Sequence, residues 1–484
     1  MSMTVKKGQI TDLDITDIAF GGKGLGRIDG LTVFVDQVVP SDRAKIRITR
    51  KRKNYAEARF LELLDPSPHR VDPPCPYSGI CGGCTWQFLN YDKQLEYKQR
   101  HVVEALEHIG GLTDVPVRAT LPSRQRFGYR NKMEFTCSDR RWLLPREMGR
   151  EVVDTDFALG LHVPGTFYKV LDTQACLLQP EFGNEILAHL RSCMKNSALP
   201  PYGLHSHTGF WRFLMLRHSA AYDQWMVNLI TATEVIDEVR PLAMALLERY
   251  PQVTSVVNNI TARKAGIAQG EYEIRLAGRS SITEKIGELV FDISANSFFQ
   301  TNTAGAEQIY RTVAKFAGLT GTERVVDLYS GIGTISLWLA PFAHRVTGIE
   351  IVASAVADAE KNSHANGIDN CRFVHGDIQN VLPGLGEIPD VLIIDPPRAG
   401  MHKKVVRQVL EMAPARIVYV SCNPATLARD LAIMSPEYRV ADVQPLDMFP
   451  HTFHIEAVVR LEKRRLSGIA FARRFGPEPP KTRT

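Results

Sequence analysis

Cys422 stands where a thiol can act as a nucleophile. It lies in the run Arg416–Asp430, in which the apolar, β-rich residues Ile417–Val420 predict a buried strand. Asn423 and Pro424 come next, and these residue types favour the N-cap and the first position of a helix. A cysteine on such a strand-to-helix turn lies at the positive end of the helix dipole, which lowers the pKa of a thiol. We therefore expect a reactive thiolate; the alternative is a buried cysteine that serves as a small apolar residue.

A second set of thiols lies near the amino terminus. It has the pattern Cys-x5-Cys-x2-Cys, interleaved with glycines, and consists of Cys75, Cys81 and Cys84. Compact thiolate sets hold zinc or a [4Fe–4S] cluster, and the presence of only one Cys-x2-Cys pair favours the cluster. A fourth ligand has to come from elsewhere, and the candidates in order of preference are Cys176, Cys137 and Cys193. A motif without any metal is the remaining alternative.

In the last third of the chain, several successive predicted strands end at or just before an acidic residue. From about residue 292 strands alternate with helices, which predicts a doubly wound parallel sheet. The acidic residues at the strand ends are Asp327, Glu350, Asp377 and Asp395. Glu350 follows Gly331 of a Gly-x-Gly turn by 19 residues, a position from which a carboxylate accepts both ribose hydroxyls of a nucleoside cofactor. We expect a cofactor site at this edge of the sheet.

The elements that precede this sheet indicate contact with a polyanion. Short strands and turns from about residue 10 to 64 predict a small β-barrel of the oligonucleotide-binding kind, with eight Lys and Arg side chains in the stretch Arg43–Arg59. A proline-rich connector follows, and residues 115–285 have an α+β pattern. The segment Arg124–Lys132 interleaves basic and aromatic residues, as an RNA-facing surface does, although a mixed edge strand has the same pattern.

The fold we predict is multidomain α/β. Its parts are an OB-like β-barrel at 1–65, a central α+β domain at 66–285, a Rossmann-like domain at 286–462 and a basic tail at 463–484. The chain is 44% hydrophobic with a net charge of +5, and it contains neither a membrane-length apolar stretch nor a signal-peptide pattern. We expect a cytoplasmic protein without a membrane or an obligate protein partner, in which the cysteines do not form disulfides.

Several of these motifs together resemble one enzyme family. The matching motifs are Asp327–Gly333, Glu350, Asp395–Gly400, Ser421–Asp430, Phe449–Thr452 and His454–Glu456. They resemble the RNA uracil-C5 methyltransferases, which use S-adenosylmethionine to make 5-methyluridine in tRNA and rRNA. The barrel looks like a TRAM domain. With the three-cysteine motif, it resembles the iron–sulfur branch that acts on 23S rRNA.

The resemblance implies a role for each site residue. Cys422 would be the nucleophile that adds to C6 of a flipped-out uracil, and Glu456 the base that removes the C5 proton. The positions that match cofactor contacts are Gln300, Tyr329, Glu350, Asp377 and Asp395. The cluster ligands would be Cys75, Cys81, Cys84 and Cys176, in a structural or RNA-positioning role. A tRNA methyltransferase and a non-catalytic iron–sulfur RNA-binding protein are the alternatives; a binding protein would need neither Cys422 nor Glu456.

Overall fold

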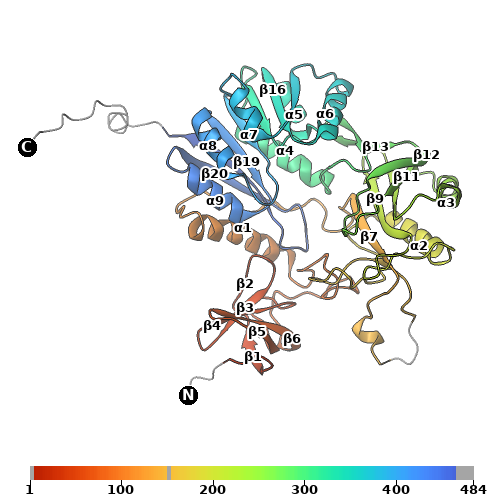
Figure 1. The fold of residues 1–484 in the computed structure, drawn as a ribbon. Helices are drawn as coiled ribbons and strands as arrows, with labels where there is room; N and C mark the ends of the chain where they lie inside the picture. Colours follow the sequence, from red (N-terminus) through yellow and green to blue (C-terminus); the bar gives the residue numbers. More distant parts are fainter. Residues whose placement is uncertain (1–4, 150–153, 465–484) are drawn as a thin grey trace, which may run out of the picture.

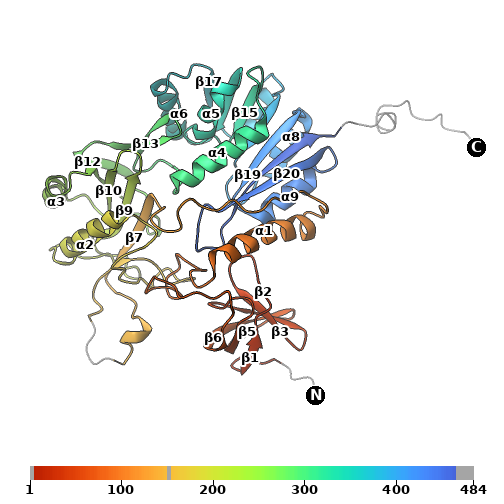
Figure 2. The same ribbon diagram turned by 180° about the vertical axis from the view of Figure 1, so that it is seen from behind.

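The structure, a computed structural model, describes residues 5–149 and 154–464. In them a β-barrel, a central mixed sheet and a larger C-terminal sheet follow one another along the chain (Figures 1 and 2). Most of the basic tail predicted from the sequence lies outside the described residues. No helix in the described ranges has both the length and the apolar character needed to cross a membrane.

The amino-terminal barrel has six strands in the order β1-β5-β6-β4-β3-β2. The strands are β1 (Ile10–Asp14), β2 (Asp17–Ile18), β3 (Gly24–Ile28), β4 (Leu31–Val35), β5 (Arg43–Lys51) and β6 (Tyr55–Asp65). Alternation along β5 turns Ala44, Ile46 and Ile48 into the barrel core, and the basic residues between them face outward. The basic run therefore lies on the barrel surface, with Lys51–Lys53 exposed at the β5–β6 turn.

The central sheet has the strand order β12-β11-β10-β9-β7-β8. Its strands are β7 (Lys132–Ser138), β8 (Ala158–Gly160), β9 (Trp211–Ser219), β10 (Gln224–Thr231), β11 (Val253–Ile260) and β12 (Tyr272–Gly278). Helices α2 (Glu181–Lys195) and α3 (Ile236–Arg249) pack on it and close its hydrophobic core. The short helix η1 (Pro145–Glu147) and the hairpin β13 (Ser281–Ile286) and β14 (Leu289–Ser294) complete this part of the chain.

The C-terminal sheet has seven strands in the order β17-β16-β15-β18-β19-β21-β20. They are β15 (Arg324–Leu328), β16 (Arg345–Glu350), β17 (Cys371–His375), β18 (Val391–Ile394), β19 (Arg416–Ser421), β20 (Tyr438–Leu446) and β21 (Glu456–Lys463). The first five run parallel, and β21 inserts antiparallel between β19 and β20. The predicted doubly wound sheet is present, and its parallel strands end at one edge.

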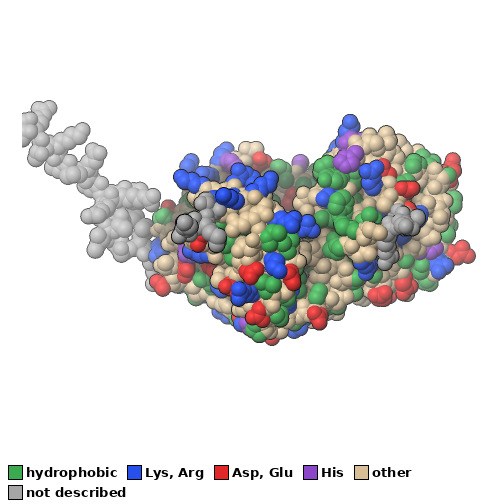
Figure 3. All heavy atoms as spheres, turned by 90° about the horizontal axis from the view of Figure 1, so that it is seen from below, with side chains coloured by type: hydrophobic (Ala, Val, Ile, Leu, Met, Phe, Trp, Pro, Cys, Tyr) green, Lys and Arg blue, Asp and Glu red, His purple; other side chains and the backbone are tan. Residues whose placement is uncertain are grey.

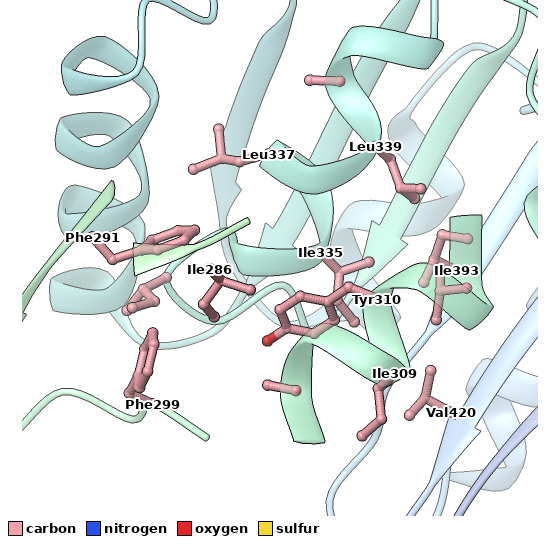
Figure 4. Close-up of a cluster of buried hydrophobic side chains, with 14 of the residues drawn as sticks. Ile286, Phe291, Phe299, Ile309, Tyr310, Ile335, Leu337, Leu339, Ile393 and Val420 are labelled. Carbon is pink, nitrogen blue, oxygen red and sulfur yellow. The ribbon is translucent and has the colours of Figure 1, made fainter. Parts of the chain in front are cut away.

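Each face of this sheet buries one set of alternating strand residues. On one face α4 (Thr303–Ala317), α5 (Thr334–Leu339) and the β13–β14 hairpin cover residues such as Ile393 and Val420 (Figure 4). The other face is covered by α1 (Tyr91–His108), α8 (Lys403–Met412) and α9 (Pro424–Met434). The remaining helices are η2 (Ala340–Phe342), α6 (Ala353–Ala365), α7 (Ile378–Val381) and η3 (Leu382–Gly384).

Helix α1 lies in a different place from the one the sequence suggested. The domain division at 66–285 places residues 91–108 in the central domain, whereas α1 follows the N-cap Asn90 and packs Val102, Ala105 and Leu106 in the C-terminal core. Residues 115–121 likewise run beside β20 through bridges at Val443 and Leu446. The apolar stripe of α1 is clear in the sequence, but which sheet buries it depends on contacts with residues more than three hundred positions away.

Candidate active site and cysteine cavity

Cys422 follows the last residue of β19 and is half-buried. The turn after it forms as the residue types predict. Asn423 is the N-cap of α9, and its side-chain oxygen accepts a hydrogen bond from the Ala425 amide at 3.1 Å. Ser421 accepts a second one from the Asn423 amide at 3.2 Å. The thiol therefore projects from a rigid strand-to-helix turn.

The pKa of Cys422 shifts in the direction opposite to our expectation. Burial raises this pKa to about 11, the Glu456 carboxylate raises it further, and Arg398 opposes the increase. The lowering that we expected from the helix N-terminus is absent in the free protein, where burial and the neighbouring Glu456 shift the pKa of Cys422 upward.

Glu456 lies beside Cys422 because their strands are neighbours. β19 and β21 pair antiparallel with Ser421 opposite Ala457, so the end of one strand meets the beginning of the other. The Glu456 side chain is buried, and burial together with Asp395 raises its pKa to about 8. Burial likewise raises the pKa of Asp395 to about 7. A thiol and two carboxyls with shifted pKa values are gathered at one edge of the sheet, as acid–base chemistry requires.

A small cavity of about 40 Å³ opens at the ends of β15 and β18. Three predicted cofactor residues line it, namely Gln300, Tyr329 and Asp395. Glu350 holds the loop that forms its floor, since its carboxylate accepts from the Gly331 amide at 3.0 Å and the Val352 amide at 2.9 Å. Asp377 is the N-cap of α7, where it accepts from the Gln379 amide at 2.8 Å.

The cavity also has lining residues that our predicted site does not include, among them Thr334, Phe298 and Asp327. Thr334 lines it and accepts a hydrogen bond from Tyr310 at 2.9 Å; Phe298 lines it with 69% of its surface exposed. Asp327, which we noted only as a strand end, is buried there and accepts from Ser336 at 2.6 Å. Burial raises the pKa of Asp327 to about 7. The sequence signal that could have identified Asp327 as a site residue is its position near the end of β15.

The segment that leads to Glu456 is anchored by buried polar groups of α1. Lys98 donates to Asp447 at 2.5 Å and to the Phe449 carbonyl at 3.1 Å, and neither side chain of the ion pair is exposed. Tyr91 donates to the other carboxylate oxygen at 2.8 Å. Gln94 accepts from the His451 amide at 2.9 Å. Helix α1 thereby sets the path of the chain into β21.

The basic and aromatic segment Arg124–Lys132 also anchors the segment that leads to Glu456. Phe127 stacks on His451 with ring centroids 4.3 Å apart, and the Tyr129 hydroxyl donates to the Pro450 carbonyl at 3.3 Å. Asn131 donates to the Gln300 carbonyl at 2.9 Å. In the free protein the Tyr129 ring is buried and the Phe127 ring packs against His451, and the RNA-facing role of the segment stays a prediction.

Four cysteines share one cavity of about 320 Å³. They are the three residues of the motif and Cys176, and none of the described cysteines is in a disulfide. Cys137 is buried in the core of the central sheet, and Cys193 lies on α2. Of the three candidates for a fourth partner, the tertiary structure therefore brings Cys176 to the motif.

The four thiols are close enough to influence one another. Burial raises the pKa of Cys81 and of Cys84 to about 12, with neighbouring thiols adding to both shifts. Within the described residues, no group of three or more His, Cys, Asp or Glu side chains is arranged to hold a metal ion. The chain after the motif reaches the active site directly, since the Thr85 and Trp86 amides both donate to the His451 carbonyl at 2.9 Å.

Comparisons with known proteins agree with this geometry. A family model described as tRNA (Uracil-5-)-methyltransferase matches residues 219–379 and 388–464, and a TRAM domain model matches residues 4–61. An uncharacterized RNA methyltransferase of Chlorobaculum tepidum is 43% identical over 95% of this chain and 97% of its own length. Another, from Porphyromonas gingivalis, is 42% identical over 93% of this chain and 99% of its own length.

A solved structure extends the similarity to the whole fold. It is the Pyrococcus abyssi tRNA (uracil-54, C5)-methyltransferase in complex with S-adenosyl-L-homocysteine, with a TM-score of 0.72 and 28% identity. The match covers 93% of this chain and all of that one. Fold and site thus define an S-adenosylmethionine-dependent RNA methyltransferase with an amino-terminal TRAM domain. The chain belongs to the RNA (uracil-5-)-methyltransferase family.

Proposed function

We propose that this enzyme methylates C5 of a specific uridine in RNA, and that its substrate is 23S rRNA. The observation that carries the reaction type is the meeting of Cys422 and Glu456 at the β19–β21 edge, beside the cofactor cavity. Both residues have the chemical types that methylation of a pyrimidine carbon needs.

The chemistry follows from the weakness of C5 as a nucleophile. Cys422 gives its proton to solvent and its sulfur bonds to C6, which moves an electron pair of the ring toward C5 and O4. S-adenosylmethionine supplies the methyl group that C5 accepts. Glu456 as carboxylate then takes the C5 proton; the electron pair returns to the ring and the bond between sulfur and C6 breaks. Thiol and uracil ring are regenerated, and one methyl group replaces one proton.

The residues of the smaller cavity have the types that hold such a cofactor. Gln300, Tyr329 and Asp395 line the cavity, and Glu350 stands at the end of β16, where a carboxylate accepts from ribose hydroxyls. Asp395 also raises the pKa of Cys422 and of Glu456, which supports our proposal that it lies between the cofactor and the uracil. Asp377 would contact the cofactor farther along the same edge.

We also propose a [4Fe–4S] cluster bound by Cys75, Cys81, Cys84 and Cys176. The four thiols line one cavity, and burial makes their ionised forms costly without a metal, as their raised pKa values indicate. A cubane cluster is larger than a single ion and holds its thiolates farther apart. A cavity of about 320 Å³ that is lined by all four thiols has room for a cubane cluster, and this supports the proposal.

The choice of rRNA rests on the combination of the TRAM barrel with the four-cysteine cavity. The alternative is tRNA, which the name of the Pyrococcus abyssi enzyme states as the substrate of that protein. To decide between them, 5-methyluridine is mapped by mass spectrometry in rRNA and tRNA from a deletion strain and from the complemented strain. We expect one 23S rRNA uridine to lose its methyl group; loss confined to tRNA would refute the proposed substrate.

The cluster has a test that does not depend on activity. Protein purified without oxygen should be brown and contain close to four irons per chain, and Cys176→Ser should lower this content while Cys137→Ser should not. Stoichiometric zinc, or equal iron in the two variants, would refute the ligand set.

A further inference from the structure

An exposed aromatic cluster lies on the central part of the chain, away from the groups described so far. It consists of Trp142, Phe167, Tyr168 and His205, together with Lys169. Phe167 is 67% exposed, Tyr168 40% and Trp142 37%. Large rings at such exposure are costly in water, and several in contact mark a surface that binds something.

The rings contact one another rather than the protein core. Phe167 and Tyr168 meet edge to face with centroids 5.3 Å apart, and Tyr168 lies 4.9 Å from the His205 ring. The Lys169 ammonium lies over the Trp142 ring at 4.0 Å, which is a cation–π contact. The cluster thus offers free π-faces next to a positive charge.

A hairpin that is closed by backbone hydrogen bonds carries Phe167, Tyr168 and Lys169. The Val163 amide donates to the Lys169 carbonyl at 2.9 Å, and the Leu171 amide donates to the Leu161 carbonyl at 2.8 Å. The base of the hairpin lies against the cysteine cavity, because Leu161 lines it and the Gly82 amide donates to the His162 carbonyl at 2.9 Å. Rings on a fixed support bind with little loss of conformational freedom.

We propose that this cluster binds unpaired nucleotides of the RNA substrate that lie outside the target uridine. The inference rests on the proposed function and adds a second, stacking contact to it. Aromatic faces beside a cation are the groups that hold single-stranded nucleic acid, in which bases stack on rings and phosphates meet Lys or Arg. Seen from below, the molecule carries hydrophobic, Lys, Arg and His side chains interspersed with Asp and Glu (Figure 3).

The charge of the cluster favours RNA over a second copy of this chain. Lys169 forms no ion pair with a carboxylate in the described part of the chain, so its charge is available to a phosphate. An enzyme whose substrate is RNA brings a strand of negative charge to its surface in every catalytic cycle.

The test compares two RNAs that share one stem-loop. One ends in a blunt stem and the other carries a single-stranded extension, and both are labelled for fluorescence anisotropy. We expect the double change Phe167→Ala with Tyr168→Ala to weaken binding of the extended RNA at least tenfold and to leave the blunt RNA unchanged. The matched control is Tyr222→Ala with Phe342→Ala, two rings of similar exposure elsewhere, which should change neither affinity.

Two further variants separate stacking from other contacts. Phe167→Leu keeps an apolar side chain but should lose the affinity, whereas Phe167→Tyr should retain it. Lys169→Ala should reduce the slope of log affinity against log salt by about 0.7, while the ring variants leave that slope unchanged.

The inference would be overturned if the ring variants bound each of the two RNAs as tightly as the wild type does. Wild-type affinity of Phe167→Leu for the extended RNA would overturn it as well. Wild-type self-association that Phe167→Ala abolishes, with RNA affinity unchanged, would assign the cluster to a contact between copies of the chain. The ring variants should still methylate a short RNA at saturating concentration, so this test is separate from the test of the proposed function. The proposed function would fail if the wild type methylated no RNA.

Discussion

Replacing Lys98 by Met tests whether α1 positions the catalytic base. The change leaves the Asp447 carboxylate buried with Tyr91 and the Phe449 amide as partners but without its cation. Removing one member of a buried ion pair costs about 3–5 kcal/mol, because a buried charge stays uncompensated. A carboxyl group escapes that charge by keeping a proton. Since the reference pKa of aspartate is about 3.9, this costs about 4 kcal/mol at pH 7 and about 1.5 kcal/mol at pH 5.

The sign of the pH dependence follows from proton binding. In the variant the folded protein holds a proton that the unfolded chain releases above pH 4, so stability falls as pH rises. We therefore expect the destabilisation to grow between pH 5 and pH 7. The control variant combines Lys98→Met with Asp447→Asn, which removes both charges and should recover all but about 1–2 kcal/mol.

The assay measures the free energy of unfolding in urea. Unfolding is followed by hydrogen exchange of the amides of β21, the strand that starts at Glu456. Where the Lys98→Met variant remains folded, Glu456 should be displaced. The variant should then methylate RNA faster than it releases the methylated product. A covalent RNA–protein adduct should therefore accumulate at unchanged cofactor affinity. Wild-type stability in Lys98→Met, or equal destabilisation in the single and double variants, would refute the reasoning.

The other predictions concern the reaction and the RNA. Cys422→Ser should abolish methyl transfer and change cofactor binding by no more than a few fold, since a hydroxyl ionises far less than a thiol; appreciable methylation would exclude Cys422 as the nucleophile. Glu456→Gln should accumulate an adduct that survives denaturing gels and disappears when Cys422 is also replaced. Because burial raises the pKa of Glu456 to about 8 and the base acts as carboxylate after methyl transfer, the rate at which the covalent adduct is released should rise with pH through about 8, and Glu456→Gln should lose this inflection. Replacing Lys51–Lys53 with Ala should weaken binding of a folded rRNA fragment and flatten its salt dependence without changing cofactor affinity; wild-type binding would mean that this basic turn is only solvated.

The local structure of the active site was predictable from the sequence. The strand predicted at Ile417–Val420 forms within β19, and Asn423 is the N-cap of α9, as these residues indicate. The reason is that strand burial and helix capping depend on residues a few positions apart. Cys422 and Asp395 were therefore located correctly at the edge of the sheet before any tertiary contact was known.

The environment of those residues was decided only by the tertiary structure. Local sequence indicates a lowered pKa for Cys422, whereas burial and Glu456 on another strand raise this pKa in the folded protein. The cysteine motif is visible in the sequence, but its spacing leaves the fourth partner open, and the fold brings Cys176 to the cavity.

Helix α1 shows most clearly which features the sequence determines and which only the tertiary structure determines. Its length and apolar stripe are encoded in consecutive turns, so the sequence alone determines that it forms. Its function depends on Lys98 meeting Asp447, a residue 349 positions away. The partner of a buried charge is set by the folding of the whole chain, because desolvation and pairing act through space and leave no periodic pattern in the sequence.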